Sequence, residues 1–249
     1  MRAAPHAILP VLFLLLPPAQ GVTPALETLH YSAEWRLVEA GRVKVDVQPA
    51  QVRGESGRQI EVTLQTVGLV SRLYRVENRY KVSLSEEYCA ADVHAISKER
   101  GRHRETRISF DPAAKKATYH EQDLNRNTVV LEKEISTPPC THDVIGGLFA
   151  LRSKKIDLGQ WIEMPISDGK KSVMARVEAQ ERETVRTKAG TFRTIRYEAY
   201  LFNGVLYSRR GRLQVWITDD DRRLPVQFRF RLGFTVGTLT IELSKEEHP

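Results

Sequence analysis

The stretch GRLQVWITDDDRRLPVQFRFRLGFTVGTLTIEL, residues 211–243, decides the fold class. Apolar and polar side chains alternate along residues 213–218 and again along residues 226–232. A two-residue period places successive side chains on opposite faces, which is typical of a half-buried β-strand. The three aspartates at 219–221 predict the turn between these runs, because Asp tolerates turn conformations and a charged loop stays hydrated. After a glycine-flanked second turn, residues 238–243 return, so the stretch predicts three successive antiparallel strands.

The same alternation recurs along most of the remaining chain. A turn is expected at residues 39–41, a polar loop at residues 49–57, and residues 68–75 are ambiguous, with one or two helical turns as one interpretation. A sheet this wide must curl or split into two layers, and close-set turns favour antiparallel pairing. The fold class is therefore all-β, a single domain with an antiparallel incomplete barrel or strongly curved sheet and one central helix. The further strands are expected at residues 29–38, 43–47, 60–64, 74–85, 93–110, 117–121, 128–135, 161–166, 171–187, 191–202 and 205–210.

One segment breaks the alternation and predicts the central helix. A pair of prolines ends the preceding strand, and apolar residues then recur at helical spacing over residues 144–151. Thr141 or Asp143 can cap the amino terminus of this helix. Gly146 and Gly147 each cost a helix about 1 kcal/mol relative to alanine. We therefore expect the helix to lie close against another backbone.

The first 21 residues have the layout of a secretory signal peptide. A positively charged start precedes an apolar run at residues 7–16, and Ala19-Gln20-Gly21 is a small-x-small cleavage site. The apolar run has about half of the roughly 20 residues that a membrane-spanning helix needs. The competing interpretation is an uncleaved amino-terminal anchor. We divide the chain into a signal peptide, residues 1–21, and a single β-rich exported domain, residues 22–249, with no stable membrane span after cleavage.

The two cysteines, Cys89 and Cys140, are predicted to form one disulfide. An exported chain folds in an oxidising compartment, where paired thiols oxidise. Two buried free thiols are the alternative. Two cysteines are too few for a structural zinc site without suitably spaced histidines, and the seven histidines include no HxH or HxxxH pair. The sequence therefore predicts no metal and no cofactor.

Charge and motifs argue against an enzyme and against a nucleic-acid partner. A net charge of +7 over 249 residues is moderate and is not a nucleic-acid footprint. The sequence has neither a GxSxG nucleophile elbow nor a glycine-rich phosphate loop. Residues 219–221 could form a calcium site, but Arg222 and Arg223 follow at once and compete for the carboxylates. A charged hairpin turn is the preferred interpretation.

A stripe of basic residues is the candidate anion contact. Lys98, Arg100, Arg102 and Arg104 occupy alternate positions, so on one continuous strand they share a face and could hold an anionic head group. The alternative is a solvated strand face, partly neutralised by nearby glutamates. Exposed aromatics that would stack nucleobases do not interleave with this stripe.

Several short motifs, taken in order, resemble a known family. They are Cys140-Thr141-His142-Asp143-Val144, Leu148-Phe149-Ala150-Leu151-Arg152, Leu158-Gly159, Asp168-Gly169-Lys170-Lys171, Gly190-Thr191-Phe192, Val215-Trp216-Ile217-Thr218-Asp219-Asp220 and Leu224-Pro225-Val226. Together they resemble the bacterial exported family known as domain-of-unknown-function family 3108, over most of the chain. The resemblance implies one predominantly β exported domain, periplasmic or elsewhere in the Gram-negative envelope. It implies no activity, cofactor or catalytic residue.

Two classes of function follow, both of them non-enzymatic roles in the cell envelope. In the first, the curved sheet and the helix enclose an apolar cavity for a lipid or other amphiphile, with Leu148 and Phe149 among its lining residues. In the second, the protein is a structural or assembly factor that acts through an envelope protein partner. A continuous apolar cavity of several hundred cubic ångströms favours the first class, and a solidly packed core favours the second.

Overall fold

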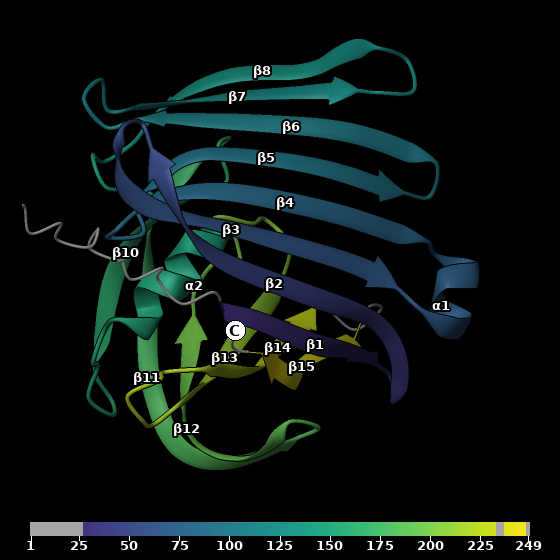
Figure 1. The fold of residues 1–249 in the computed structure, drawn as a ribbon, viewed down its shortest axis with the longest axis vertical. Helices are drawn as coiled ribbons and strands as arrows, with labels where there is room; N and C mark the ends of the chain where they lie inside the picture. Colours follow the sequence, from purple (N-terminus) through teal and green to yellow (C-terminus); the bar gives the residue numbers. More distant parts are fainter. Residues whose placement is uncertain (1–26, 233–236, 248–249) are drawn as a thin grey trace, which may run out of the picture.

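The computed structural model describes residues 27–232 and 237–247, and the predicted signal peptide lies outside them. In this part of the chain there are one 15-stranded sheet and two helices. Figure 1 shows the sheet curled around helix α2. The strands are β1 (Glu27–Trp35), β2 (Val38–Val52), β3 (Glu55–Thr66), β4 (Val76–Ser85), β5 (Ala90–Glu99), β6 (Arg102–Asp111), β7 (Lys116–Asp123), β8 (Thr128–Ser136), β9 (His142–Asp143), β10 (Trp161–Ser167), β11 (Ser172–Thr187), β12 (Gly190–Ala199), β13 (Gly211–Thr218), β14 (Pro225–Leu232) and β15 (Gly237–Glu247), and the helices are α1 (Gly68–Leu73) and α2 (Val144–Arg152).

The strand order follows the chain, except that the first described strand, β1, lies in the middle of the sheet. Strands β1 to β8 run outward to one edge, and residues 137–160 then carry the chain through α2 to the other edge. Strands β10 to β15 return, and β15 pairs antiparallel with β1, with Leu239 opposite Trp35. Among the described strand pairs, the short β9 is parallel to β10 and the others are antiparallel. The prediction of an all-β, strongly curved antiparallel sheet with a central helix is confirmed.

In the described residues no strand pairing joins the edge strands β8 and β9, and the β10–β11 turn reaches across this gap to β6 and β7. The turn at residues 168–171 lies against the inner face of β6 and β7. A Cβ atom on Gly169 would lie 2.8 Å from Ile108 Cδ1 and 2.9 Å from Tyr119 Cδ2. Gly169 also has a φ of 81°, so both space and backbone conformation require glycine there. Lys170 Nζ, 5.2 Å from the Tyr119 ring centroid, adds a cation–π contact across the gap.

Two boundaries near the start of the domain were predicted wrongly. The β1–β2 turn is at residues 36–37, both with positive φ, and not at residues 39–41. The expected loop at residues 49–57 is the end of a long β2–β3 hairpin that turns at residues 53–54. Polar composition did not mark a loop here, because the hairpin backbone is paired while most of its side chains face solvent.

Two further strand predictions were wrong. Residues 93–110 form two strands, β5 and β6, separated by Arg100 and Gly101, whose φ values are 45° and 80°. Positive φ at both central positions is what a two-residue hairpin with a type I′ turn requires. Residues 205–210 are part of a turn-rich loop in which the Leu206 N–H donates to the Leu201 carbonyl at 2.9 Å.

Helix α2 is held in the hollow of the sheet by two apolar clusters. Phe149 belongs to the first cluster, with Leu84 and Tyr119 among its other members. Leu151 belongs to the second, with Ile166 among its other members. The predicted helix at residues 144–151 is therefore confirmed, and the ambiguous residues 68–75 contain the short helix α1. In the described residues we find no helix with the length and apolarity needed to cross a membrane.

Candidate functional site

The amino terminus of α2 begins at a buried cap. Both carboxylate oxygens of Asp143 accept backbone N–H bonds, from Ile145 at 2.9 Å and from Gly146 at 2.8 Å. A Cβ atom on Gly146 would lie 3.1 Å from the Tyr88 carbonyl oxygen and 2.7 Å from Asp143 Oδ1. The glycine pair predicted this close approach to another backbone. The sequence offered Thr141 or Asp143 as the cap, and the structure shows that Asp143 caps the helix.

A disulfide and two hydrogen bonds tie this end of α2 to the β4–β5 turn. Cys89 and Cys140 are bonded, with their Cα atoms 5.0 Å apart, as predicted. The Ala90 N–H donates to the Thr141 carbonyl at 2.8 Å. His142 Nδ1 lies 2.7 Å from the Tyr88 carbonyl oxygen. Since both thiols are consumed by the disulfide, neither is free as a metal ligand.

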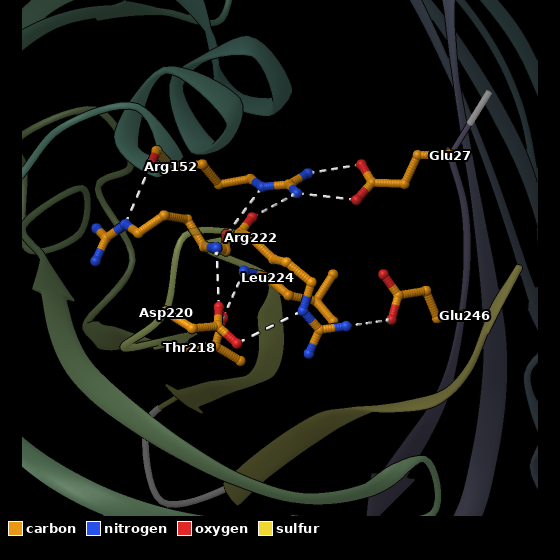
Figure 2. Close-up of polar contacts among 8 residues, drawn as sticks. Glu27, Arg152, Thr218, Asp220, Arg222, Leu224 and Glu246 are labelled. Atoms are coloured by element: carbon orange, nitrogen blue, oxygen red, sulfur yellow. Dashed lines mark hydrogen bonds and ion pairs between the residues drawn. The ribbon is translucent and has the colours of Figure 1, made fainter. Parts of the chain in front are cut away.

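The carboxyl terminus of α2 is fixed by Arg152, whose side chain is only 15% exposed. Its Nη1 and Nη2 atoms donate to the two carboxylate oxygens of Glu27, at 2.7 and 2.9 Å, as Figure 2 shows. Its Nε and Nη2 atoms donate to the carbonyls of Arg223 and Arg222, at 2.9 and 3.2 Å. We call Arg152, Glu27 and these two carbonyls the α2 clamp. The clamp joins α2 to β1 and to the β13–β14 turn.

The aspartates at 219–221 lie in the charged turn that was predicted for them. Asp219 Oδ2 accepts from Arg182 Nε at 2.7 Å. Asp220 accepts from the Arg223 N–H at 3.3 Å and lies 3.5 Å from Arg222 Nε (Figure 2). These two carboxylates therefore act as partners of arginines and of the turn backbone, and the geometry gives the calcium interpretation no support.

An apolar cavity of about 710 Å³ lies between α2 and the inner face of the sheet. Its walls come from β1–β3, from α2, and from β10 to β15 with the loop at residues 200–210. Among the described lining residues, the exceptions to an apolar lining are Tyr31, Tyr207 and Arg209. The Tyr31 hydroxyl donates to the Pro225 carbonyl at 2.9 Å, and burial raises the pKa of Tyr207 to about 12. The lining of the cavity is thus uncharged except for Arg209, which is exposed and lies at the border.

Leu148 and Phe149 both border this cavity but are held differently. Phe149 is 3% exposed, and its ring stacks on Tyr88 with centroids 6.2 Å apart. Leu148 is half-buried and packs against the second apolar cluster. Phe149 is therefore part of the packed core, whereas Leu148 has room beside it. Leu148 is the better position at which to change the cavity without removing a support of the fold.

The four basic residues at 98, 100, 102 and 104 do not form a continuous stripe, because they do not lie on one strand as predicted. Arg100 lies in the β5–β6 turn, with its guanidinium 5.4 Å from the Tyr74 ring centroid. Lys98 pairs with His103 across the hairpin, so it lies on the face opposite to Arg102 and Arg104.

Arg104 faces the inside of the sheet, where its Nη2 atom lies 3.2 Å from Asp123 Oδ2. Its Nη1 atom is buried and has no hydrogen-bond partner among the described residues. Arg102 is exposed near the hairpin end. The anion contact predicted for Arg100, Arg102 and Arg104 as a set therefore loses its geometric basis, although single arginines of the set keep open donors.

A larger hollow, of about 860 Å³, lies on the outer face of β4–β8. It is lined mostly by polar and charged side chains, which include Lys81 and His120. Glu105 on this face is already the partner of His94 Nε2 at 2.7 Å and of Arg107 Nη2 at 2.8 Å. The larger volume of this hollow therefore does not make it the better candidate for a binding site. The apolar cavity is the stronger candidate, because transfer of apolar surface out of water is favourable there.

The cap of α2 gives a pH-dependent prediction. Burial raises the pKa of Asp143 to about 6 from 3.8, against its two backbone donors, which favour the charged form. Between these two pH values the folded chain binds the proton more tightly than the unfolded chain, so Asp143 lowers stability as pH rises through that window. Asp143→Asn removes this titration and keeps a capping side chain.

We therefore expect the stability of Asp143→Asn relative to the parent protein to increase from about pH 4 to about pH 7. Thermal unfolding of both proteins at the two ends of this range measures the effect. Because only one residue differs, other titrating groups contribute equally to both proteins. A difference in Tm that does not change with pH would contradict the raised pKa.

The fold and the site together define an all-β protein with one strongly curved, unclosed sheet, a capped internal helix and an apolar cavity. The chain belongs to the DUF3108 family of proteins of unknown function, whose family model matches residues 30–244. The resemblance seen in the sequence motifs is therefore confirmed. No curated protein matches the chain.

Comparison with solved structures finds chains of low sequence identity to this one. A β-barrel-like protein of the DUF1849 family from Brucella abortus has a TM-score of 0.57 and 8% identity, over 90% of this chain and 98% of that one. A putative exported protein with a YmcC-like fold from Bacteroides fragilis has a TM-score of 0.34 and 8% identity, over 89% and 95% of the two chains. A putative lipoprotein from Parabacteroides distasonis has a TM-score of 0.33 and 9% identity, over 90% and 96%. The Brucella abortus structure supports the fold assignment and nothing about function.

Proposed function

We propose that this protein is a non-enzymatic binding protein of the bacterial envelope that holds the apolar part of a lipid or other amphiphile in its internal cavity. The observation that carries the proposal is the apolar cavity of about 710 Å³ under α2. Small-molecule sites in proteins typically occupy about 300–1,000 Å³ and are mostly apolar with a few polar groups. The volume and the lining both fall within that description.

The chemistry of the lining also favours binding over catalysis. None of the described lining residues is an Asp, a Glu or a His, so the cavity lacks the usual general acids and bases. Arg209 is the charged residue at its border. A guanidinium there suits an anionic head group, while the apolar tail occupies the interior. The ligand class that fits is therefore an anionic amphiphile.

An envelope location is supported by two independent features. The Cys89–Cys140 disulfide is the kind of cross-link that persists in oxidising compartments. The amino-terminal sequence has the layout of a secretory signal peptide, with a cleavage site at residues 19–21. Both features fit an exported protein of the periplasm or another envelope compartment.

The second candidate function, an assembly factor acting on a protein partner, is favoured by one observation. Strand β8 is the last strand at its edge of the sheet, and Val129, Val130 and Leu131 on it are exposed. An open, apolar strand edge is a template for pairing with a strand of another chain. This surface is compatible with a filled cavity, so the two functions do not exclude one another.

Leu148 variants test the binding function directly. Leu148→Trp adds an indole to the cavity, and we expect it to weaken binding of a fluorescent fatty-acid probe by roughly tenfold or more, which is 1.4 kcal/mol or above. Leu148→Ala enlarges the cavity and is expected to keep probe binding. Titration of the probe by fluorescence, with urea unfolding of each variant, separates binding from stability.

The matched control is Met174→Trp, because Met174 is 51% exposed and outside the cavity lining. This variant is expected to bind the probe as the parent does. Native mass spectrometry of protein purified from its own envelope should show a bound lipid mass. A parent protein that binds no probe and carries no lipid would end the proposal and leave the assembly-factor function in front.

A further inference from the structure

A group of apolar side chains is exposed at one rim of the sheet. Leu37 is 91% exposed, Leu73 72% and Leu69 62%, and Val38 and Tyr74 are exposed as well. We call the segments that carry them, residues 36–38, 68–75 and 100–102, the α1 rim. No residue of helix α1 is buried, so its leucines do not serve the core of this fold.

Backbone contacts hold the three segments of the α1 rim together. The Val67 N–H donates to the Ala40 carbonyl at 3.0 Å, which fixes the start of α1 beside β2. The Arg100 N–H donates to the Arg75 carbonyl at 3.2 Å, which joins the β5–β6 turn to the end of the α1 segment. Figure 1 shows α1, the β1–β2 turn and the β5–β6 turn along the same right-hand rim, with α1 projecting beyond the strand ends.

The charged residues of the α1 rim are all basic. It contains five arginines and no aspartate or glutamate. One of them, Arg75, is paired with Glu77 from the adjoining strand β4, at 2.5 Å. Arg72, Arg100 and Arg102 are exposed and add positive charge to the rim. A partner for this surface must therefore combine negative charge with an apolar layer that accepts leucine side chains.

The surface of an anionic lipid bilayer has this combination. Leu69 and Leu73 are four residues apart, so they lie on one face of α1. Apolar side chains of a surface-bound helix enter the boundary between head groups and acyl chains, while arginines bind the phosphates. A protein partner would need a contact of about 800 Å² per side, and a single projecting turn of helix is a poor base for that. We infer that the α1 rim binds the surface of an anionic lipid bilayer.

The α1 rim adjoins the wall of the apolar cavity. Leu64, which lines the cavity, is two residues from the end of β3, where α1 follows. Leu239, another lining residue, is paired with Trp35, the residue before the rim begins. A protein bound by this rim therefore places one end of its cavity wall next to the membrane. The docking goes beyond the proposed function and does not require a cargo in the cavity.

Vesicle co-sedimentation tests the inference. The oxidised protein is expected to bind phosphatidylcholine vesicles that contain phosphatidylglycerol, and not vesicles of phosphatidylcholine alone, with binding weakened by added salt. The double variants Leu69→Ser/Leu73→Ser and Arg72→Glu/Arg100→Glu are each expected to lose about tenfold or more in vesicle affinity. These side chains are exposed, so both variants should keep the parent's urea unfolding midpoint.

The matched control is Val129→Ser/Val130→Ser, which removes exposed aliphatic side chains from β8 and should bind vesicles as the parent does. The inference is overturned if the parent binds no vesicles, binds neutral ones equally well, or keeps its affinity in both rim variants. The fatty-acid probe separates this result from the cavity proposal. Rim variants should retain probe binding in solution, and Leu148→Trp should retain vesicle binding.

Discussion

Replacing Arg152 by alanine is expected to lower the free energy of unfolding by about 3–5 kcal/mol. The side chain is 15% exposed and makes two bonds to Glu27 and one each to the carbonyls of Arg222 and Arg223. Removing it leaves a largely buried carboxylate and two carbonyls without these donors. The penalty of those unpaired groups, rather than the worth of the ion pair itself, sets the size of the loss. Urea unfolding of the two proteins measures it.

Two control variants test this interpretation. Arg152→Met/Glu27→Leu removes both charges together and is expected to lose much less than Arg152→Ala, because it leaves no unpaired buried charge. Lys116→Ala breaks the exposed ion pair with Glu134 and should leave the unfolding midpoint unchanged. If Arg152→Ala were no less stable than Lys116→Ala, the α2 clamp would have no role in holding the helix.

The final meander shows what alternation predicts and what it leaves out. It was enough to predict β13, β14 and β15, since side-chain period specifies a strand. It did not show that both faces of β13 are buried, with Trp216 and Thr218 each 1% exposed and Gln214 5%. The long β11–β12 hairpin folds back over these strands, and Glu183 on it accepts from Trp216 Nε1 at 3.2 Å. Whether the β11–β12 hairpin covers the second face of β13 depends on the curvature of the sheet, which has no local sequence signal.

The missed β1–β2 turn has a physical cause. The β1–β2 turn uses Arg36 and Leu37 at φ values of 51° and 65°, where no glycine or asparagine marks it. Non-glycine residues are uncommon at positive φ. The turn was therefore predicted at residues 39–41, which include Gly41. Gly41 lies within β2, where a Cβ atom would be 2.9 Å from the Gln65 carbonyl oxygen. Close strand packing, rather than a turn, explains that glycine.

Some residues of the candidate site could be predicted from local sequence signals, and others are brought together only by the fold. The capped helix and its residues Leu148 and Phe149 could be predicted, because cap and apolar spacing are local signals. The pairing of Arg152 with Glu27 joins residues 125 positions apart, and only the fold brings them together. A basic residue in the last turn of a helix has a sufficient local explanation in the helix dipole, so nothing marked Arg152 as a clamp.

Loss of the disulfide is expected to lower the free energy of unfolding by about 4 kcal/mol, the chain-entropy value for a loop of this size. Cys89 and Cys140 are 51 residues apart in the sequence, and the bond joins the β4–β5 turn to the segment that begins α2. The double variant Cys89→Ser/Cys140→Ser should therefore unfold at lower urea concentration than the oxidised parent. Probe binding should weaken as well, because the amino-terminal end of α2, one wall of the cavity, loses its covalent anchor.

Reduction of the parent protein gives an independent measurement of the same bond. Dithiothreitol should move the parent's unfolding midpoint to that of the double variant and leave the double variant unchanged. The Ala90–Thr141 backbone hydrogen bond and the contact of the His142 side chain with the Tyr88 carbonyl remain in both, so the fold should survive at low urea concentration. Equal midpoints for oxidised and reduced parent would mean that these contacts alone position α2. In that case the disulfide would be a marker of the compartment rather than a support of the cavity.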